Sequence, residues 1–334
     1  MKKYIFIVIL SLPCLSFAQD KKIRHYIFFS RDREAIHDSS FYSNRGVAGA
    51  QITYAWKKIE PGENQYDFTA IEEDLVFLQS KGKKLFIQIQ DVTFDKNLYA
   101  VPKYLLTDTI YHGGANAQYV IDAKGNPVNA GWVARRWDTA VARRFHLLLK
   151  KLAQQFDGRI EGINLPETAV DFPDLPGLLP KGFSRKTYVE SIKKNMSVLK
   201  QYFKKSTPLL YANFMPYDSK EDLHQIYEHA KQIKIGMGGP DIKVYREAQM
   251  NNSYPLIRGM AGKVATGVAV QEGNYSVINP RTGKPATLSD ILSFAIDYLK
   301  LDYIFWCTEE PYYSKKVLPM LLALHKKNLL VAGK

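Results

Sequence analysis

Eight short apolar runs, each followed by a stretch of helical periodicity, constrain the fold of this chain more than any other feature of its sequence. The runs are nearly continuous in hydrophobicity, which is typical of parallel strands that are buried on both faces. They cover residues 25–30, 47–52, 84–90, 160–165, 208–214, 233–237, 264–270 and 303–307. Eight strands that alternate with helices favour a single α/β domain of the (β/α)8 type, the TIM barrel, although the count alone also fits an open, doubly wound sheet.

The segments between these runs carry helix signals. Apolar side chains recur at helical spacing over residues 137–156, and Ser184 is suited to cap a helix over residues 185–203. Two connections are long. Roughly 45 residues follow the third run before the next helix, and a proline-rich segment, residues 172–180, follows the fourth; long connections in compact domains are usually functional.

Glu167 and Glu272 are the two side chains that this arrangement singles out. Glu167 comes two residues after the fourth run, and Glu272 comes two residues after the seventh. In a parallel barrel both emerge at the carboxyl ends of the strands, where barrel enzymes place their chemistry. Two carboxyl groups that face each other across a cleft are the working parts of a glycosidase, one as proton donor and one as nucleophile or base.

Several segments resemble the clan A glycoside hydrolases, and together they span nearly the whole chain after the leader. Trp56, the turn Ile59-Glu60-Pro61 and the helix start Tyr66-Asp67-Phe68 are similar to the element that follows the second strand in that clan. Residues 82–89 resemble its third strand, and residues 137–167 resemble the helix and fourth strand that lead to its acid/base glutamate. Val270-Gln271-Glu272-Gly273 resembles its strand-seven nucleophile, and residues 303–306 resemble its eighth strand.

This resemblance implies a retaining hydrolase that cleaves a β-linked oligo- or polysaccharide, with Glu167 as general acid/base and Glu272 as nucleophile. It implies no cofactor and no metal. The chain departs from the clan at one position, because the clan places Asn directly before the acid/base, where it binds the sugar 2-hydroxyl. Here that position is Pro166, and the nearest Asn is Asn164. No particular family within the clan is identified.

Other residues at or near the ends of the runs are candidates for binding the sugar. They are Asn164, Trp56, Gln271, Tyr275, Trp306, Asn213 and Tyr217. Glu309 and Glu310 follow the eighth run and are rivals for either catalytic role. Two other classes of protein stay open: a glycan-binding barrel without catalysis, and a polysaccharide lyase that acts on an acidic glycan.

The first eighteen residues predict a signal peptide. Lys2 and Lys3 precede an apolar run that is too short to span a bilayer, and in Ser16-Phe17-Ala18 the residues at the two positions that a signal peptidase reads are small. We expect cleavage after Ala18, which leaves residues 19–334 as one secreted or periplasmic domain. Lipid anchoring at Cys14 is the less favoured alternative, because residues 11–13 match a lipoprotein site poorly. No other stretch suggests stable membrane insertion.

Composition excludes several classes of site. Hydrophobic residues make up 46% of the chain, enough for a large core, and only Cys307 remains after the predicted cleavage, so we expect neither an intramolecular disulfide nor a cysteine metal site. The seven histidines show no paired metal spacing. The net charge of +13 is spread over the outer faces of the expected helices, so a nucleic-acid partner is not expected. The oligomeric state is not indicated.

Overall fold

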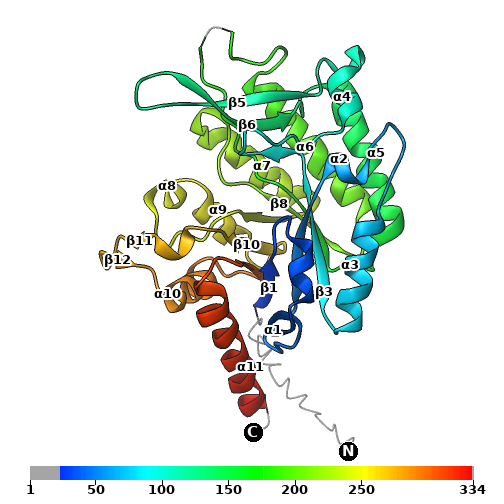
Figure 1. Cartoon of the computed structure of the whole chain (residues 1–334). Coiled ribbons are helices and arrows are strands. Elements are labelled where there is room, and N and C mark those ends of the chain that lie inside the picture. The colour runs from blue at the N-terminus through cyan, green and yellow to red at the C-terminus, as the bar shows by residue number, and fades with distance from the viewer. Residues whose placement is uncertain (1–22, 176, 333–334) are drawn as a thin grey trace, which may run out of the picture.

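The computed structural model describes residues 23–332 except residue 176, so the predicted leader, including Cys14, lies outside the described residues. Eight parallel strands close into a barrel in which each strand pairs with the next one along the chain and the last pairs with the first (Figure 1). The predicted single (β/α)8 barrel is confirmed. The barrel strands are β1 (Arg24–Phe28), β2 (Gly49–Ala55), β3 (Lys84–Gln90), β7 (Gly162–Leu165), β8 (Thr207–Tyr211), β9 (Gly236–Gly239), β10 (Thr266–Val270) and β13 (Tyr303–Cys307).

Helices connect the strands and cover the barrel. They are η1 (Arg33–His37), α1 (Ser39–Tyr42), α2 (Trp56–Ile59), α3 (Thr69–Ser80), α5 (Thr139–Phe156), α6 (Arg185–Tyr202), α7 (Lys220–Ile233), α8 (Glu247–Met250), α9 (Ser253–Met260), α10 (Leu288–Ser293), η5 (Phe294–Tyr298), η6 (Tyr313–Val317) and α11 (Leu318–Ala332). Ser184 caps α6, as predicted from the sequence. The structure adds that Ser184 and Thr187 form a capping box. The predicted strand at residues 233–237 begins too early, because α7 extends to Ile233 and ends at Lys234, which has a left-handed backbone. Across residues 23–332, residue 176 excepted, no helix has the length and apolarity needed to cross a membrane.

Aromatic side chains fill the inside of the barrel. Their buried cluster consists of Tyr26, Phe86, Leu209, Tyr211, Ala269, Tyr303 and Phe305. The large rings fit because glycine occupies neighbouring inward positions. A Cβ on Gly162 would lie 2.3 Å from the Phe86 ring, and one on Gly267 would lie 3.0 Å from the Phe305 ring.

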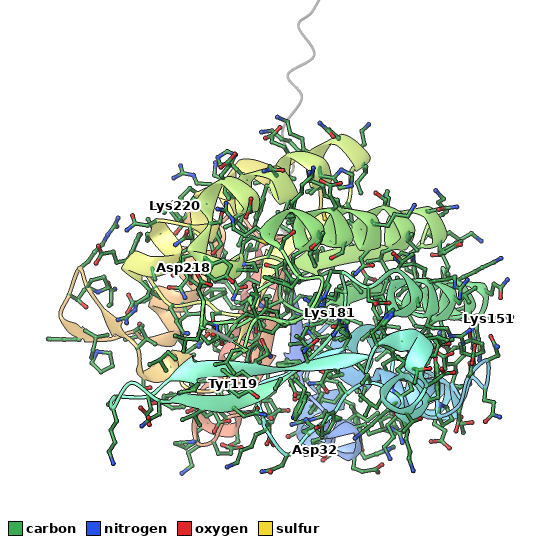
Figure 2. The ribbon with its side chains drawn as sticks, turned by 90° about the horizontal axis from the view of Figure 1, so that it is seen from above. Asp32, Tyr119, Lys151, Lys181, Asp218 and Lys220 are labelled. Atoms are coloured by element: carbon green, nitrogen blue, oxygen red, sulfur yellow. The ribbon has the colours of Figure 1, made fainter. Side chains whose placement is uncertain are left out.

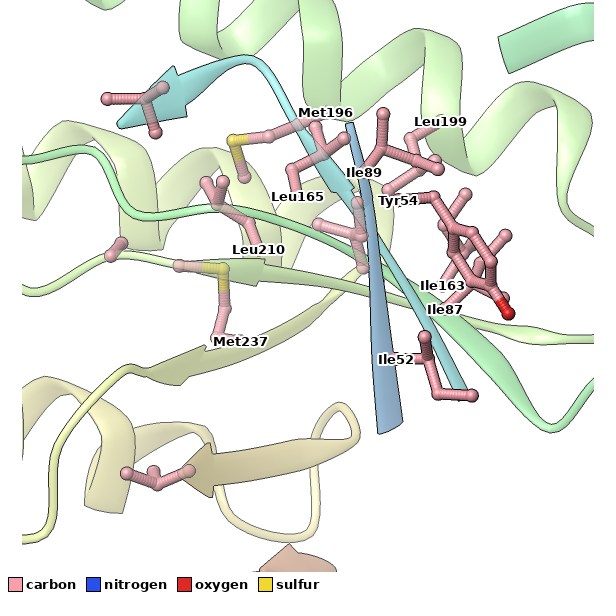
Figure 3. Packing of buried hydrophobic residues seen from close by; sticks show 14 of the residues in the cluster. Ile52, Tyr54, Ile87, Ile89, Ile163, Leu165, Met196, Leu199, Leu210 and Met237 are labelled. Carbon is pink, nitrogen blue, oxygen red and sulfur yellow. The ribbon is translucent and has the colours of Figure 1, made fainter. Parts of the chain in front are cut away.

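Branched side chains on the outer faces of the same strands pack against the helices. Figure 3 shows Ile163, Leu165 and Leu210 of adjacent strands beside Met196 and Leu199 of α6. Alternate residues of each strand therefore serve the inner and outer cores, which explains why the strands read as continuous apolar runs.

The long connection after β3 is more ordered than the sequence indicates. It contains α4 (Lys103–Thr107), the turn η2 (Thr109–Tyr111) and an antiparallel sheet of β4 (Val92–Thr93), β5 (Ala115–Ile121) and β6 (Pro127–Ala134). This sheet lies above the carboxyl ends of the barrel strands in Figure 1, and Figure 2 shows its strand pair, marked by Tyr119, crossing the view from above. The Tyr119 amide donates to the Asp171 carbonyl, so the sheet is tied to the loop that follows β7.

The Ile-Glu-Pro turn has a structural role. Glu60 is fully buried, accepts a hydrogen bond from the Trp56 indole at 2.7 Å and pairs with Arg144 of α5. Removing either partner of such a buried ion pair leaves an uncompensated charge, which typically costs about 3–5 kcal/mol. The turn therefore fastens the end of β2 to the helix that precedes β7.

The glycine positions inside the barrel give a stability prediction. Gly162→Ala should lower the free energy of unfolding by about 1–3 kcal/mol, because the new methyl group overlaps the Phe86 ring. Urea unfolding measures this change. Gly259→Ala is the matched control: its Cβ would meet nothing within 4 Å, and alanine in helix α9 should be neutral or stabilising by about 0.5–1 kcal/mol. Equal loss in both variants would contradict this account of the barrel interior.

Candidate active site

Glu167 sits on a short turn that is clipped to the neighbouring strand. It follows β7 by two residues, and the next residue, Thr168, donates its amide to the Tyr211 carbonyl at the end of β8. The Thr168 hydroxyl donates to the Phe214 carbonyl at 2.6 Å. These two bonds fix the backbone at the rim, and Pro166 restricts it from the other side. The carboxyl group is therefore presented by a rigid element.

A buried ion pair supports this turn from outside the barrel. The guanidinium of Arg136, just before α5, donates to both carboxylate oxygens of Asp91 at 2.7 and 2.8 Å, and both side chains are buried. Its remaining terminal nitrogen donates to the Glu167 carbonyl at 3.1 Å and to the Tyr188 hydroxyl at 2.8 Å, and Tyr188 donates in turn to the Thr168 carbonyl. The planar guanidinium makes these bonds at fixed angles. The network holds the backbone on both sides of the Glu167 carboxyl.

The Glu167 carboxyl group has a pKa far above that of an ordinary glutamate. Its pKa is raised from the ordinary value near 4.5 to about 7, chiefly by loss of hydration, and the negative charge of Asp241 acts in the same direction. A hydrogen bond from the Asn213 amide to Oε2, 2.6 Å long, and the positive charges of Arg136 and Lys243 act in the opposite direction. A carboxyl group with this pKa is neutral often enough near pH 7 to donate a proton.

A second polar cluster joins the loops that follow β9 and β10. Asp241 accepts from the Asn274 side chain at 2.9 Å and pairs with Lys243 at 3.2 Å. The buried Asn274 also accepts from the amides of Ile242 and Gln271. One asparagine thus fixes the loop that carries Asp241 relative to the loop that carries Gln271. The charges of both Asp241 and Lys243 act on Glu167.

Glu272 lies on the second of these loops, at the same rim as Glu167. Its side chain is exposed. The adjacent Gly273 amide donates to Glu309 at 2.8 Å, which ties this loop to the one after β13. The other rival, Glu310, accepts from the amide and hydroxyl of Ser314 at the start of the last helical segment. No hydrogen bond or ion pair within the described residues joins Glu167 to Glu272.

Three predicted binding residues are fully buried and engaged within the protein. Trp56 bonds to Glu60, and Trp306 donates its indole N–H to the His25 ring at 3.2 Å. Asn164 lies inside the barrel, where it accepts from Gln51 at 2.8 Å. We place these three beneath and around the rim, as its support. A direct contact with a sugar would require them to move.

The other four predicted binding residues differ in their access to solvent. Gln271 is partly exposed at the rim, and Tyr275 is almost buried, stacked on Tyr312 with ring centroids 4.7 Å apart. Tyr217 is 48% exposed and stands on the turn η3 (Pro216–Asp218) after β8. Asn213 is 6% exposed and touches Glu167 directly. Gln271 and Tyr217 are thus the predicted binding residues that the structure leaves accessible at the rim, whereas Asn213 is buried beside Glu167.

Two large hollows lie away from the two glutamates. One, of about 1350 Å³, opens at the amino ends of the strands and is lined in part by Arg24, Arg45 and Lys300. The other, of about 670 Å³, lies between α10 and the last helix and is lined in part by Tyr275 and Tyr312. The rim is therefore distinguished as the candidate active site by its chemistry and not by the size of a cavity.

Asp91, Arg136 and Asn274 help to hold this site together and are not among the residues predicted from the sequence, whereas the segment that ends at Asp241 is predicted as a turn first and a binding loop second. The signal for the first two is a carboxylate directly after the third run and an arginine directly before a helix. Gly238-Gly239-Pro240-Asp241 reads as a turn, and only the barrel order brings its carboxylate toward Glu167. Within the described residues no group of three or more His, Cys, Asp or Glu side chains has a geometry that could hold a metal ion.

The (β/α)8 fold is similar to that of solved glycoside hydrolases, in agreement with the fold that the sequence resemblance implies. Xylanase 10B from Thermotoga petrophila RKU-1 in complex with xylobiose matches with a TM-score of 0.51 at 12% identity, over 85% of this chain and 82% of that one. GH5_18 from Streptomyces cattleya in complex with GlcNAc matches with a TM-score of 0.51 at 9% identity, over 86% and 70%. The catalytic domain of beta-amylase from Paenibacillus polymyxa matches with a TM-score of 0.50 at 10% identity, over 86% and 92%. No family model and no curated protein sequence matches the chain.

The raised pKa of Glu167 predicts how stability depends on pH. Below pH 4.5 the carboxyl is protonated in both folded and unfolded chains, whereas above pH 7 the folded chain must hold an ionised, poorly hydrated carboxylate. Glu167→Gln should therefore raise the free energy of unfolding by about 1–3 kcal/mol at pH 8 and by little at pH 4.5. Urea unfolding at the two pH values measures the difference. Glu272→Gln, at an exposed position, is the control and should change stability little at either pH. A gain for Glu167→Gln that is equal at both pH values would contradict this electrostatic description.

Proposed function

We propose that the protein is a glycoside hydrolase that cleaves a β-linked glycan with retention of configuration, with Glu167 as general acid/base. The observation that carries the proposal is the Glu167 carboxyl itself: it stands at the carboxyl rim of a (β/α)8 barrel on a rigid turn, and loss of hydration raises its pKa to about 7. A glycosidic oxygen is a poor leaving group unless it is protonated, so a neutral carboxyl at this place supplies what the reaction needs.

Glu272 is the nucleophile in this proposal. In the first step its carboxylate bonds to the anomeric carbon, the glycosidic C–O bond breaks, and the proton of Glu167 passes to the departing oxygen. In the second step Glu167 takes a proton from water, the water oxygen bonds to the anomeric carbon, and the ester to Glu272 breaks. Support for Glu272 is its place after β10, three strands along the barrel from β7, and the resemblance of its segment to the clan A nucleophile.

Asp241 is the main rival for the second carboxylate role, because its charge acts on Glu167. Two features argue for a supporting role instead. Its two oxygens are already occupied, one by Asn274 and one by Lys243. A carboxylate that is neutralised by an ammonium group is a weaker nucleophile than the free, exposed carboxylate of Glu272.

The activity is tested on a panel of aryl β-glycosides and of plant, algal and bacterial polysaccharides. The proposal expects reducing ends to form from at least one member of the panel. Products that absorb in the ultraviolet through a new double bond would indicate a lyase instead. Specific binding without cleavage would indicate a glycan-binding barrel.

Two variants separate the roles of the glutamates. Glu272→Ala should lose several orders of magnitude of activity on every substrate, because no glycosyl-enzyme forms. Glu167→Ala should keep much faster glycosyl-enzyme formation on substrates with good leaving groups than on natural glycans, because only the proton transfer is lost. Steady-state and burst kinetics with aryl glycosides measure both effects.

Rescue by azide is an independent test of which glutamate is the acid/base and which is the nucleophile. With azide, the Glu167→Ala variant should yield a glycosyl azide of retained configuration and Glu272→Ala one of inverted configuration. Asp241→Ala and Glu310→Ala are run beside them. If Glu272→Ala keeps near wild-type turnover while one of these two gives the inverted azide, the nucleophile is misassigned although the class of enzyme stands.

We propose further that the protein is exported, on the strength of Lys2 and Lys3, the apolar run and Ser16-Phe17-Ala18. Mass spectrometry of the protein from its native host should find Gln19 at the amino terminus. An intact Met1, or a lipid on Cys14, would reject cleavage after Ala18.

A further inference from the structure

Exposed basic side chains surround the amino ends of the barrel strands, on the face opposite the candidate active site. At or shortly before the start of each of the eight strands stands an exposed lysine or arginine. On one side of the barrel these residues, at β1, β2, β10 and β13, are Arg24, Arg45, Lys263 and Lys300. On the other side, at β3, β7, β8 and β9, they are Lys84, Arg159, Lys204 and Lys234. Together they form an amino-end ring of positive charge.

Carboxylates in the same segments offset this ring only in part. Asp157 accepts hydrogen bonds from three successive backbone amides before β8. Glu161 pairs with two members of the ring, Arg24 and Lys84. Asp302 is buried and accepts from the Thr266 amide. The face therefore presents a net positive charge to solvent.

A hollow of about 1350 Å³ opens within the ring, between the starts of β1, β2, β10 and β13 and the helix α11. Arg24, Arg45 and Lys300 of the ring line it. Much of the remaining wall is apolar, and Ile296 of η5 is 45% exposed there. The other large apolar side chains of the wall include Leu292, Leu301, Leu321 and Leu324. Apolar walls beside cationic groups match an amphiphile that has an anionic headgroup.

Helix dipoles explain part of the ring but not the whole face. The main barrel helices end at this face, and cations are favoured near the carboxyl end of a helix. This preference accounts for Lys204 and Lys234, which directly follow α6 and α7 and their caps. It does not account for Arg24 and Lys84, which are the first residues of strands, or for an exposed isoleucine in an apolar hollow beside them. A surface that offers both anions and hydrocarbon fits both features.

The opposite face carries exposed carboxylates. They follow β7, β8, β10 and β13, and they include Asp171, Asp218, Glu272 and Glu310. An anionic surface therefore attracts the amino-end ring and repels the active-site rim, which orients the whole barrel.

We propose that the amino-end ring and its hollow dock the protein on a membrane that contains anionic lipids, with the candidate active site facing away from the bilayer. The attachment is peripheral, since no helix within residues 23–332, residue 176 apart, could cross a membrane. It does not depend on the proposed glycosidase function. In Figure 1 helix α11 runs past the amino ends of the strands, and its exposed Lys326 and Lys327 add positive charge on that side.

Electrostatic attraction and apolar contact should both contribute to the docking. One lysine or arginine near an anionic bilayer strengthens binding about fivefold, and salt weakens this contribution by screening. Ile296 in the lipid interface adds a contribution that salt does not screen. Binding should therefore require anionic lipid and should decline as the salt concentration rises.

The first test is sedimentation of the processed protein with vesicles of phosphatidylcholine, with and without phosphatidylglycerol. Wild type should bind the anionic vesicles. Arg45→Gln combined with Lys300→Gln should weaken that binding about 30-fold, because two cations leave the hollow. The matched control combines Arg143→Gln with Lys150→Gln, which removes the same charge from exposed positions of α5 and should change binding by less than about threefold. Thermal unfolding checks that each variant is folded, and the two single variants, about fivefold each, replace the pair if it is not.

The second test reports which face meets the bilayer. Ile296→Cys is labelled with a polarity-sensitive fluorophore, which is selective because Cys307 is buried. Its emission should shift to the blue on anionic vesicles. Val76→Cys is the matched control, since Val76 is also an exposed apolar residue, 55% exposed, but lies on α3 away from the hollow. Its emission should not shift.

Several results would overturn the proposal. One is the absence of binding to anionic vesicles. Another is an equal loss of binding in the two double variants, which would indicate a diffuse attraction of the net charge. A blue shift at position 76 without one at position 296 would place a different face on the bilayer. Binding of glycerol phosphate or dextran sulfate as tight as that of vesicles, lost in the Arg45 and Lys300 variant and without a blue shift on vesicles, would assign the ring to soluble anions.

Discussion

Closure of the parallel barrel is the constraint on which the rest of this structure depends. Because all eight strands run in one direction and each pairs with both neighbours, their carboxyl ends meet at a single rim. Asp91, Glu167, Asn213 and Asp241 are widely separated in the chain, and closure of the barrel brings all four to the same rim. The closure in turn requires that the interior be filled, and the alternation of aromatic rings with glycines at inward positions achieves this.

At the rim, the most important property is the pKa of the Glu167 carboxyl, which several opposing influences determine. Loss of hydration and the charge of Asp241 favour the neutral acid, whereas the Asn213 hydrogen bond and the charges of Arg136 and Lys243 favour the carboxylate. The opposing influences leave the pKa at about 7, so a single group can give a proton in one step and take one in the next. The Asp91–Arg136 pair contributes mainly geometry, because it holds the backbone on both sides of the carboxyl.

The barrel and the place of both glutamates could be predicted because they depend on local patterns. Buried parallel strands read as apolar runs, and a residue two positions beyond such a run must lie at the rim. The site around Glu167 could not be predicted, since it depends on which loops touch: Asp91 meets Arg136 across an inserted sheet that the sequence shows only as a long connection. The roles of Trp56 and Trp306 could not be predicted from residue type, because a tryptophan near the end of a strand can either stack on a sugar or fill the core. Both side chains are fully buried here.

The central claim is that two carboxylates at this rim act in sequence through a covalent glycosyl-enzyme. The most direct measurement is trapping with activated 2-deoxy-2-fluoro glycosides, which slow both steps and let the intermediate accumulate. Peptide mass spectrometry then locates the label, and the account predicts one sugar on Glu272, with none on the Glu272→Ala variant. A label on Asp241, Glu309 or Glu310 would contradict the assignment of the nucleophile. Turnover that yields a product of inverted configuration, with no labelled peptide, would contradict the double displacement itself.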